Sequence, residues 1–175
     1  MRFLGIDPGL RLTGYGCVEF TPAARSTPRL VEAGVIRLPA SESLSSRLAE
    51  LDRDFRALLD ALRPDAVAVE MLYAHYKHPA TAIIMGHARG VLLLAITSRA
   101  LPLIELRPTE IKKSLIGHGH ASKEQMQEGV RAELRLDARP DPPDVADALA
   151  IALCGARRHE LSVRCAPAGL PVPRR

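Results

Sequence analysis

The chain begins with MRFLGIDPGLRLTGYG, residues 1–16, which gives the clearest indication of its fold. An apolar run from Leu4 to Ile6 stops at Asp7. Such a run predicts a short buried strand, and a carboxylate at its end lies at the sheet edge, where water or a ligand reaches it. Three glycines follow, at Gly9, Gly14 and Gly16. Asp7 is therefore the first candidate for a functional residue, and the glycines predict a tight turn beside it.

Further strands follow from the same type of pattern. The chain opens with three β-rich stretches, Arg2 to Asp7, Thr13 to Phe20 and Leu30 to Leu38, which predict an antiparallel meander. Ala66 to Glu70 (AVAVE) is another apolar run that ends in a carboxylate, and Leu103 to Leu106 predicts a fifth strand. Two predicted strands thus end in an acid.

Helical periodicity fills the intervals between the later strands. Leucines from Leu44 to Leu62 predict an amphipathic helix that ends before Pro64. The segment from Pro79 to about Ala100 predicts a long helix, and its Ala, Gly, Ile and Leu content favours burial on most sides. Pro108 to His120 is short-helical and loop-like. Two more helices are expected, from about Ser122 to Leu134 and from about Asp144 to Arg158.

Five strands interleaved with helices predict an α/β fold with a mixed sheet. At 175 residues the chain is the size of one domain, which we place at residues 1–158, and the Pro- and Arg-rich residues 159–175 predict a flexible tail. The longest apolar run, Val91 to Ile96, is too short to span a bilayer, so no membrane is expected. Three cysteines without metal-ligand spacing favour a reducing cytoplasm, and the formal charge of +4 suits a polyanionic partner.

Four carboxylates occupy suggestive places in this pattern. Asp7 and Glu70 each end a predicted strand, and Asp144 and Asp147 share one face of the last helix. Phosphodiester cleavage needs an activated water and positive charge at the leaving oxygen, and two divalent ions about 3.5 to 4 Å apart supply both. Hard oxygen ligands favour Mg²⁺ or Mn²⁺ over zinc. Taken singly, each acid has a structural explanation as a cap or a strand end. The set becomes a candidate metal site only if the four converge.

Five motifs, in order, resemble the RuvC family of Holliday-junction resolvases: GIDPGLRLTGYG, AVEMLY, MGHARG, KKSLIG and DVADALAIA. The resemblance extends to about Arg158. It implies a ribonuclease H-like fold, with a five-stranded mixed sheet and helices on both faces. It also implies a homodimeric endonuclease that resolves four-way DNA junctions by paired symmetric nicks during recombination and repair, and that works with the branch-migration proteins RuvA and RuvB.

The resemblance also assigns the catalytic residues. By motif position Asp7, Glu70, Asp144 and Asp147 would be the catalytic acids and would hold two Mg²⁺ or Mn²⁺ ions. Some family members have a histidine where this chain has Asp144, which makes its role the most variable. Lys123 would offset the charge that develops in the transition state.

DNA-binding roles are implied for a second group of residues. Tyr73 would stack on an unpaired base near the crossover, with phenylalanine at this position in many relatives and packing within its own loop as the alternative. Lys112 and Lys123 match basic positions near the scissile phosphate, and Arg89 lies in the MGHARG helix. Five histidines lack the spacing of zinc ligands and are expected to be solvated or capping residues, with a place near DNA as an alternative for His118 and His120. They are His75, His78, His87, His118 and His120.

Three alternatives stay open on the sequence alone. The opening IDPG with a following TG is similar to the first phosphate loop of actin-like ATPases and sugar kinases, although these use two such domains and this chain has room for one. A junction-binding module without catalysis is disfavoured, because four converging carboxylates without metal repel one another. A nuclease with another branched DNA or an RNA hybrid as substrate is the third.

Overall fold

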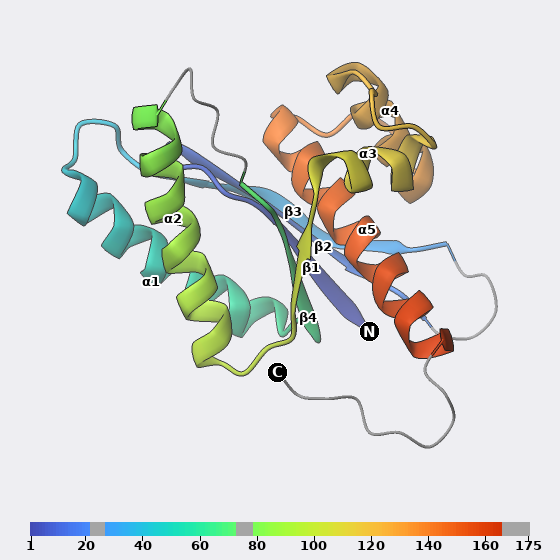
Figure 1. Cartoon of the computed structure of the whole chain (residues 1–175), viewed down its shortest axis with the longest axis horizontal. Helices are drawn as coiled ribbons and strands as arrows, with labels where there is room; N and C mark the ends of the chain where they lie inside the picture. Colours follow the sequence, from blue (N-terminus) through green and yellow to red (C-terminus); the bar gives the residue numbers. More distant parts are fainter. Residues whose placement is uncertain (22–26, 73–78, 166–175) are drawn as a thin grey trace.

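The computed structural model describes residues 1–21, 27–72 and 79–165, which form a five-stranded mixed sheet with helices on both faces (Figure 1). The strand order is β3-β2-β1-β4-β5. β1 pairs antiparallel with β2, β2 pairs antiparallel with β3, and β4 and β5 run parallel to β1. The predicted meander and mixed sheet are confirmed. The strands are β1 (Arg2–Asp7), β2 (Leu12–Glu19), β3 (Arg29–Arg37), β4 (Ala66–Glu70) and β5 (Leu103–Leu106).

Two helical layers enclose the sheet (Figure 1). One layer contains α1 (Leu44–Leu62) and α2 (Pro79–Ser98). The other contains α5 (Pro143–Cys165), which lies on the sheet, and outside it α3 (Pro108–Ile116) and α4 (Lys123–Leu134). Each layer has its own hydrophobic cluster, because successive residues of every strand point to opposite faces.

The first helix shows how local sequence sets an element. The Ser43 hydroxyl accepts a hydrogen bond from the Ser46 amide and caps the start of α1, and Arg63 ends the helix in the left-handed conformation just before Pro64. Its leucines repeat at helical spacing, so one face is buried against the sheet and α2. The buried residues of α1 are Leu51, Phe55, Leu59 and Leu62.

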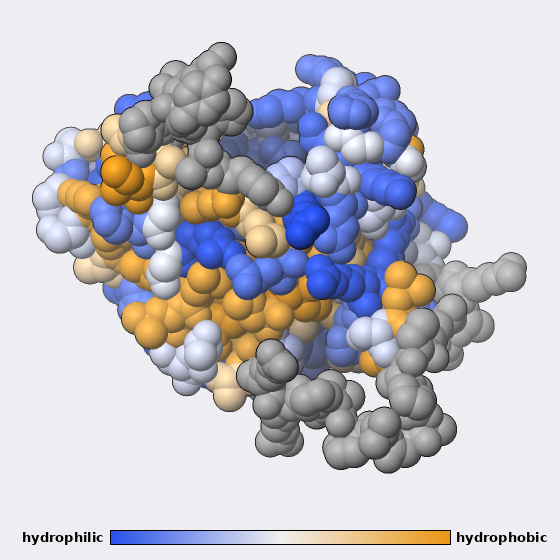
Figure 2. Space-filling model, viewed as in Figure 1, coloured by the Kyte–Doolittle hydropathy of each residue, from blue (hydrophilic) through white to orange (hydrophobic). Residues whose placement is uncertain are grey.

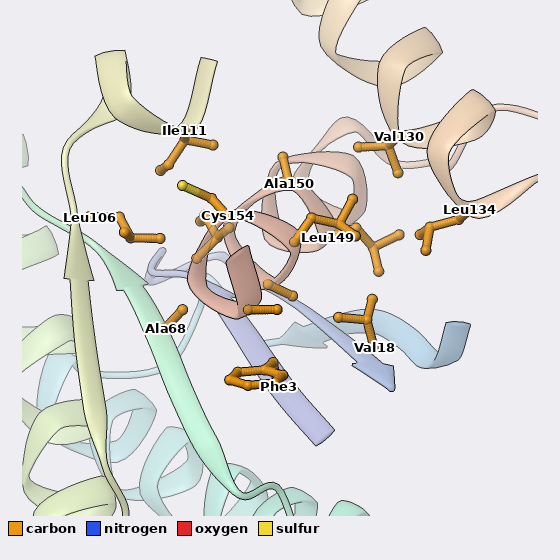
Figure 3. Packing of buried hydrophobic residues seen from close by; sticks show 14 of the residues in the cluster. Phe3, Val18, Ala68, Leu106, Ile111, Val130, Leu134, Leu149, Ala150 and Cys154 are labelled. Atoms are coloured by element: carbon orange, nitrogen blue, oxygen red, sulfur yellow. The ribbon is translucent and has the colours of Figure 1, made fainter. Parts of the chain in front are cut away.

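Helix α5 packs very closely on the strands beneath it. Figure 3 shows Leu149, Ala150 and Cys154 of α5 between sheet residues such as Phe3, Val18 and Ala68 and residues of α3 and α4. Strand glycines permit this approach: a Cβ atom on Gly5 would lie 2.1 Å from the carbonyl oxygen of Ala148. The backbone of α5 therefore packs directly against the strand backbone, and this contact sets the distance between α5 and the sheet.

Two elements differ from the sequence prediction. Helix α5 continues through Cys165 rather than ending near Arg158, so the first part of the predicted tail is helical. Residues 166–175 lie outside the described residues. Helix α2 was expected to be buried on most sides, which is wrong for the single chain: the face towards α1 is buried, but Ile83 and Leu94 on the other face are 60% and 63% exposed.

By length and composition alone, Ala80–Ser98 of α2 would be long and apolar enough to cross a membrane. The sequence prediction considered only continuous apolar runs, and these do not reveal the apolar character of the whole helix. A single helix of this kind is weak evidence for a membrane span. Ala88, Leu92, Ala95 and Ile96 of α2 belong to the protein's own hydrophobic core, against α1 and the sheet.

Candidate active site

Asp7 and Glu70 lie at the same end of two neighbouring parallel strands. The β1–β4 register pairs Ile6 with Val69, so the residues that follow, Asp7 and Glu70, reach the sheet edge side by side. Strand alternation turns both side chains towards the α5 face, since Gly5 of β1 and Ala68 of β4 contact α5. The two strand-end acids are therefore brought together on one face.

The first turn of α5 adds the other two acids. Asp144 and Asp147 lie three residues apart and so on one face of the helix. Gly14 of β2 is paired with Asp7 and makes room for this turn, because a Cβ atom on Gly14 would lie 2.2 Å from the carbonyl oxygen of Asp144. Gly14 and Gly16 are thus strand residues under α5 rather than parts of the predicted turn, and Gly9 alone of the three lies in the turn.

The electrostatics of Asp7 show that the acids share one site. Burial, together with the negative charges of Asp147, Glu70 and Asp144, raises the pKa of Asp7 to about 7, and the charge of Lys123 opposes this shift. Carboxylates that act on one another in this way cannot all be charged cheaply without a cation. The four predicted acids therefore form one electrostatically coupled cluster.

Two lysines face the cluster from the outer helices. Burial and the charge of Asp147 raise the pKa of Glu70, and Lys112 of α3 opposes this shift. Burial likewise raises the pKa of Asp147, whereas Lys123 and Lys112 lower it. Both lysines therefore lie close enough to offset the negative charge of the cluster.

A cleft of about 260 Å³ opens between these groups. We call it the carboxylate cleft; Glu70, Asp147, Lys112 and Lys123 line it, together with Pro108 and the apolar side chains of Ile111, Ala121, Met126 and Ile151. Its walls come from β4, α3, α4 and α5. An anionic group that entered it would meet both the lysines and any cation held by the carboxylates.

The donor chemistry suits a hard divalent cation, because all four acids present only oxygen atoms. As placed, the described His, Cys, Asp and Glu residues include no group of three or more that could hold a metal ion. Binding would thus require the carboxylates of Asp7, Glu70, Asp144 and Asp147 to move towards one another. A divalent cation would offset the mutual repulsion of these carboxylates.

The turn after Asp7 is braced by residues that sequence analysis missed. Thr13 is fully buried, and its hydroxyl donates to the Gly9 carbonyl oxygen at 2.5 Å and accepts from the Gly9 amide at 3.4 Å. Arg47 of α1 donates from its terminal nitrogen to the carbonyl oxygen of Leu10. A threonine four residues beyond a turn glycine was the available signal for the first contact, whereas no local signal identified Arg47.

The other predicted site residues fall in different places. Arg89 lies on α2, where it pairs with Glu105 and donates to the Glu70 carbonyl oxygen at 3.3 Å. Lys113, the neighbour of Lys112, is exposed and lines a separate pocket beside Cys154. Tyr73 lies outside the described residues, as do His75 and His78.

Comparison with known proteins adds independent evidence. Residues 3–155 match the family described as crossover junction endodeoxyribonuclease RuvC. The RuvC protein of Rhodopirellula baltica is 46% identical over 154 residues, which cover 87% of this chain and 84% of that protein. A Synechococcus RuvC is 39% identical over 162 residues, covering 91% of this chain and all of that protein.

Solved structures agree with the sequence matches. Thermus thermophilus RuvC superposes with a TM-score of 0.84 at 34% identity, covering 93% of this chain and 97% of that one. The same protein, in complex with a Holliday junction substrate, gives the same TM-score. The yeast mitochondrial Holliday junction resolvase, at 17% identity and a TM-score of 0.68, shares the fold.

Proposed function

The chain belongs to the RuvC family of crossover junction endodeoxyribonucleases, and we propose that it cuts four-way DNA junctions by metal-dependent hydrolysis in the carboxylate cleft. Nucleases of this family act in recombination and repair and are metal-dependent in general. One observation supports this site above all others. Asp7, Glu70, Asp144 and Asp147 come from three separate elements and form one coupled cluster beside two lysines.

We assign metal binding to the four acids, with two Mg²⁺ or Mn²⁺ ions per site. Such ions would activate a water molecule and stabilise the leaving oxygen of a phosphodiester. Asp7 and Glu70 contribute from rigid strand ends, and Asp144 and Asp147 contribute from the first turn of α5. Strand and helix positions hold ligands more firmly than loops do.

The lysines have a different role in the proposed reaction. Lys123 and Lys112 face the acids across the cleft, so they would bind the scissile phosphate and offset the charge that develops during in-line attack. The products would carry a 5′ phosphate and a 3′ hydroxyl. Tyr73, which follows Glu70 by three residues, stays our candidate for stacking on an unpaired base.

A homodimer is supported by the exposed face of α2. Figure 2 shows apolar side chains gathered over α2 and the neighbouring edge of the sheet. Ile83, Ile84 and Leu94 are exposed large apolar residues of this helix, and at Gly86 and Gly90 a Cβ atom would meet nothing within 4 Å. A second copy could therefore approach α2 closely, and two cleavage sites in one dimer would suit two opposed strands.

Cooperation with RuvA and RuvB and a cytoplasmic location complete the proposal. Both follow from the family and its DNA substrate, and the free thiols of Cys17 and Cys154 suit a reducing compartment. The alternative of an actin-like or sugar-kinase-like ATP-binding domain is not supported, because residues 3–155 match the RuvC family.

A synthetic four-way junction tests the proposed function directly. The protein is incubated with this junction or with a linear duplex of the same sequence, with Mg²⁺, with Mn²⁺ or with EDTA. We expect symmetric nicks in the junction alone and only with metal. Asp7→Asn should bind the junction but leave it uncut. Equal cutting of the linear duplex would contradict the substrate, and wild-type rates for Asp7→Asn would contradict the site.

A further inference from the structure

Arg89 lies behind the sheet rather than in the carboxylate cleft. Val67 and Val69 of β4 point into the core shared with α1 and α2, so the intervening residues and Glu70 point the other way, towards α5. In β5 the same alternation places Glu105 on the α2 face, next to Leu103. Arg89 meets Glu105 on that face.

The contacts of Arg89 leave little of it free for DNA. Its terminal nitrogen forms an ion pair with Glu105, its Nε donates to the Glu70 carbonyl oxygen at 3.3 Å, and its side chain is only 17% exposed. To reach a phosphate, the guanidinium would have to break both contacts and leave its partly buried position. A DNA contact, the role expected from the sequence, is therefore disfavoured.

The same contacts allow Arg89 to influence the direction in which the Glu70 side chain points. The Met71 amide donates to the Leu106 carbonyl oxygen at 2.8 Å, and this hydrogen bond links the chain to the end of β5 just after Glu70. A hydrogen bond to the Glu70 carbonyl restrains its peptide plane and so the direction of its Cα–Cβ bond. Glu105 in turn keeps the long side chain of Arg89 in one rotamer.

We propose that Arg89 and Glu105 form a positioning pair that orients Glu70 for metal binding from the opposite face of the sheet. This inference rests on the proposed function, in which Glu70 is a metal ligand. Groups that orient a metal ligand affect metal affinity by about 10- to 100-fold when removed. Because Arg89 acts through the backbone, we expect an effect at the lower end of that range.

The test measures Mn²⁺ binding to the DNA-free protein by electron paramagnetic resonance of the free ion. Arg89→Met and Glu105→Gln should each raise the Mn²⁺ dissociation constant by about 10-fold, and the double variant should add little, because both substitutions break the same unit. Arg99→Met is the matched control. Arg99, which follows the last residue of α2, also pairs with a carboxylate, Asp60, and donates to the carbonyl oxygen of Arg56, but both of these partners belong to α1.

Junction binding without cleavage separates positioning from DNA contact. With Ca²⁺ in place of Mn²⁺, we expect all these variants to bind the junction like the wild type and with the same salt dependence. If Arg89→Met instead lost junction affinity, with a shallower salt slope and unchanged Mn²⁺ binding, Arg89 would be a phosphate contact and the proposal would be overturned.

Two further arms keep the result decisive. Should Arg89→Met fail to fold, Glu105→Gln retains the arginine and still tests the pair; wild-type Mn²⁺ affinity in that variant would contradict the proposal. Asp7→Asn should abolish Mn²⁺ binding at the site. If Asp7→Asn still binds Mn²⁺ at the site, both the proposed metal site and the positioning role are wrong. If Asp7→Asn loses Mn²⁺ binding but Glu105→Gln keeps wild-type Mn²⁺ affinity, only the positioning role is contradicted.

Discussion

Asp7 carries a cost to stability when no cation is present. Burial and the neighbouring acids raise its pKa from 3.8 to about 7, so between these values the folded protein holds a proton that the unfolded chain has released. Stability contributed by this proton is present below about pH 4 and is lost as the pH rises towards 7. The metal-free protein is therefore destabilised at neutral and alkaline pH.

Replacing Asp7 with Asn removes that cost. In EDTA at pH 8 we expect Asp7→Asn to be more stable than the wild type by about 2 kcal/mol or more, and at pH 4 the difference should nearly vanish. Urea denaturation at both pH values measures it. Added Mg²⁺ should stabilise the wild type but not the variant, because the cation binds the folded acids. An equal difference at both pH values would show that Asp7 is not the titrating group.

At the scale of elements, the closeness of α5 to β2 decides where two of the acids lie. A Cβ atom on Gly14 would meet the Asp144 backbone at 2.2 Å, so Gly14→Ala must push the first turn of α5 away. We expect a loss of about 3 kcal/mol in unfolding free energy and weaker stabilisation by Mg²⁺. Gly119→Ala is the control, since its Cβ would lie 3.7 Å from Thr109, an ordinary contact. Similar thermal denaturation curves for the two variants would refute this account.

The N-terminal cap of α4 determines the position of Lys123. Ser122 caps the helix, with its hydroxyl accepting from the Gln125 amide and the Gln125 side chain accepting from the Ser122 amide. Ser122→Ala should cost about 1 kcal/mol and also slow junction cleavage, because Lys123 is the first residue of the helix. Ser43→Ala removes the corresponding cap of α1.

Comparison of the two cap variants separates stability from catalysis. Both should lose similar stability in urea denaturation, but only Ser122→Ala should cut junctions several-fold more slowly at saturating DNA. A slower rate in Ser43→Ala of the same size would mean that general destabilisation, rather than the position of Lys123, limits the reaction.

Local patterns predicted most elements, and they failed where tertiary contacts decide. Apolar runs ending in acids predicted β1 and β4, and period-3.6 leucines predicted α1, because each signal lies within a few residues. A glycine is needed at position 14 because the Asp144 backbone packs against it, and Asp144 lies 130 positions later in the chain. Similarly, the MGHARG motif suggested DNA for Arg89, and no local pattern indicates the face on which Arg89 lies, because that face follows from how α2 packs on the sheet.

At the scale of the whole molecule, α2 is apolar on more sides than one chain can bury. Its composition predicted burial, and in the single chain the prediction holds only for the face that contains Ala88 and Leu92. Composition predicts that a helix face is buried, but it does not indicate whether the surface that buries this face belongs to the same chain or to a second one. The exposed face is thus a feature that a single chain leaves unexplained and a dimer would explain.

The exposed face of α2 allows a direct test of the dimer. Ile83 and Leu94 lie 11 residues apart, about three helical turns, and so on one stripe of α2. We expect the wild type to sediment as a dimer at micromolar concentration, and Ile83→Glu or Leu94→Glu to sediment as monomers, because burying an unpaired carboxylate costs several kcal/mol. Leu161→Glu is the matched control, since Leu161 of α5 is 62% exposed, as much as Leu94.

Activity should follow the oligomeric state of these variants. Each monomeric variant keeps its carboxylate cleft and should bind Mn²⁺ like the wild type. The paired symmetric nicks should be lost, because a monomer has no second active site to cut the opposite strand. Leu161→Glu should remain dimeric and make paired nicks. A monomeric wild type that still nicks both strands symmetrically, or a Leu161→Glu variant that dissociates while Leu94→Glu does not, would place the interface elsewhere.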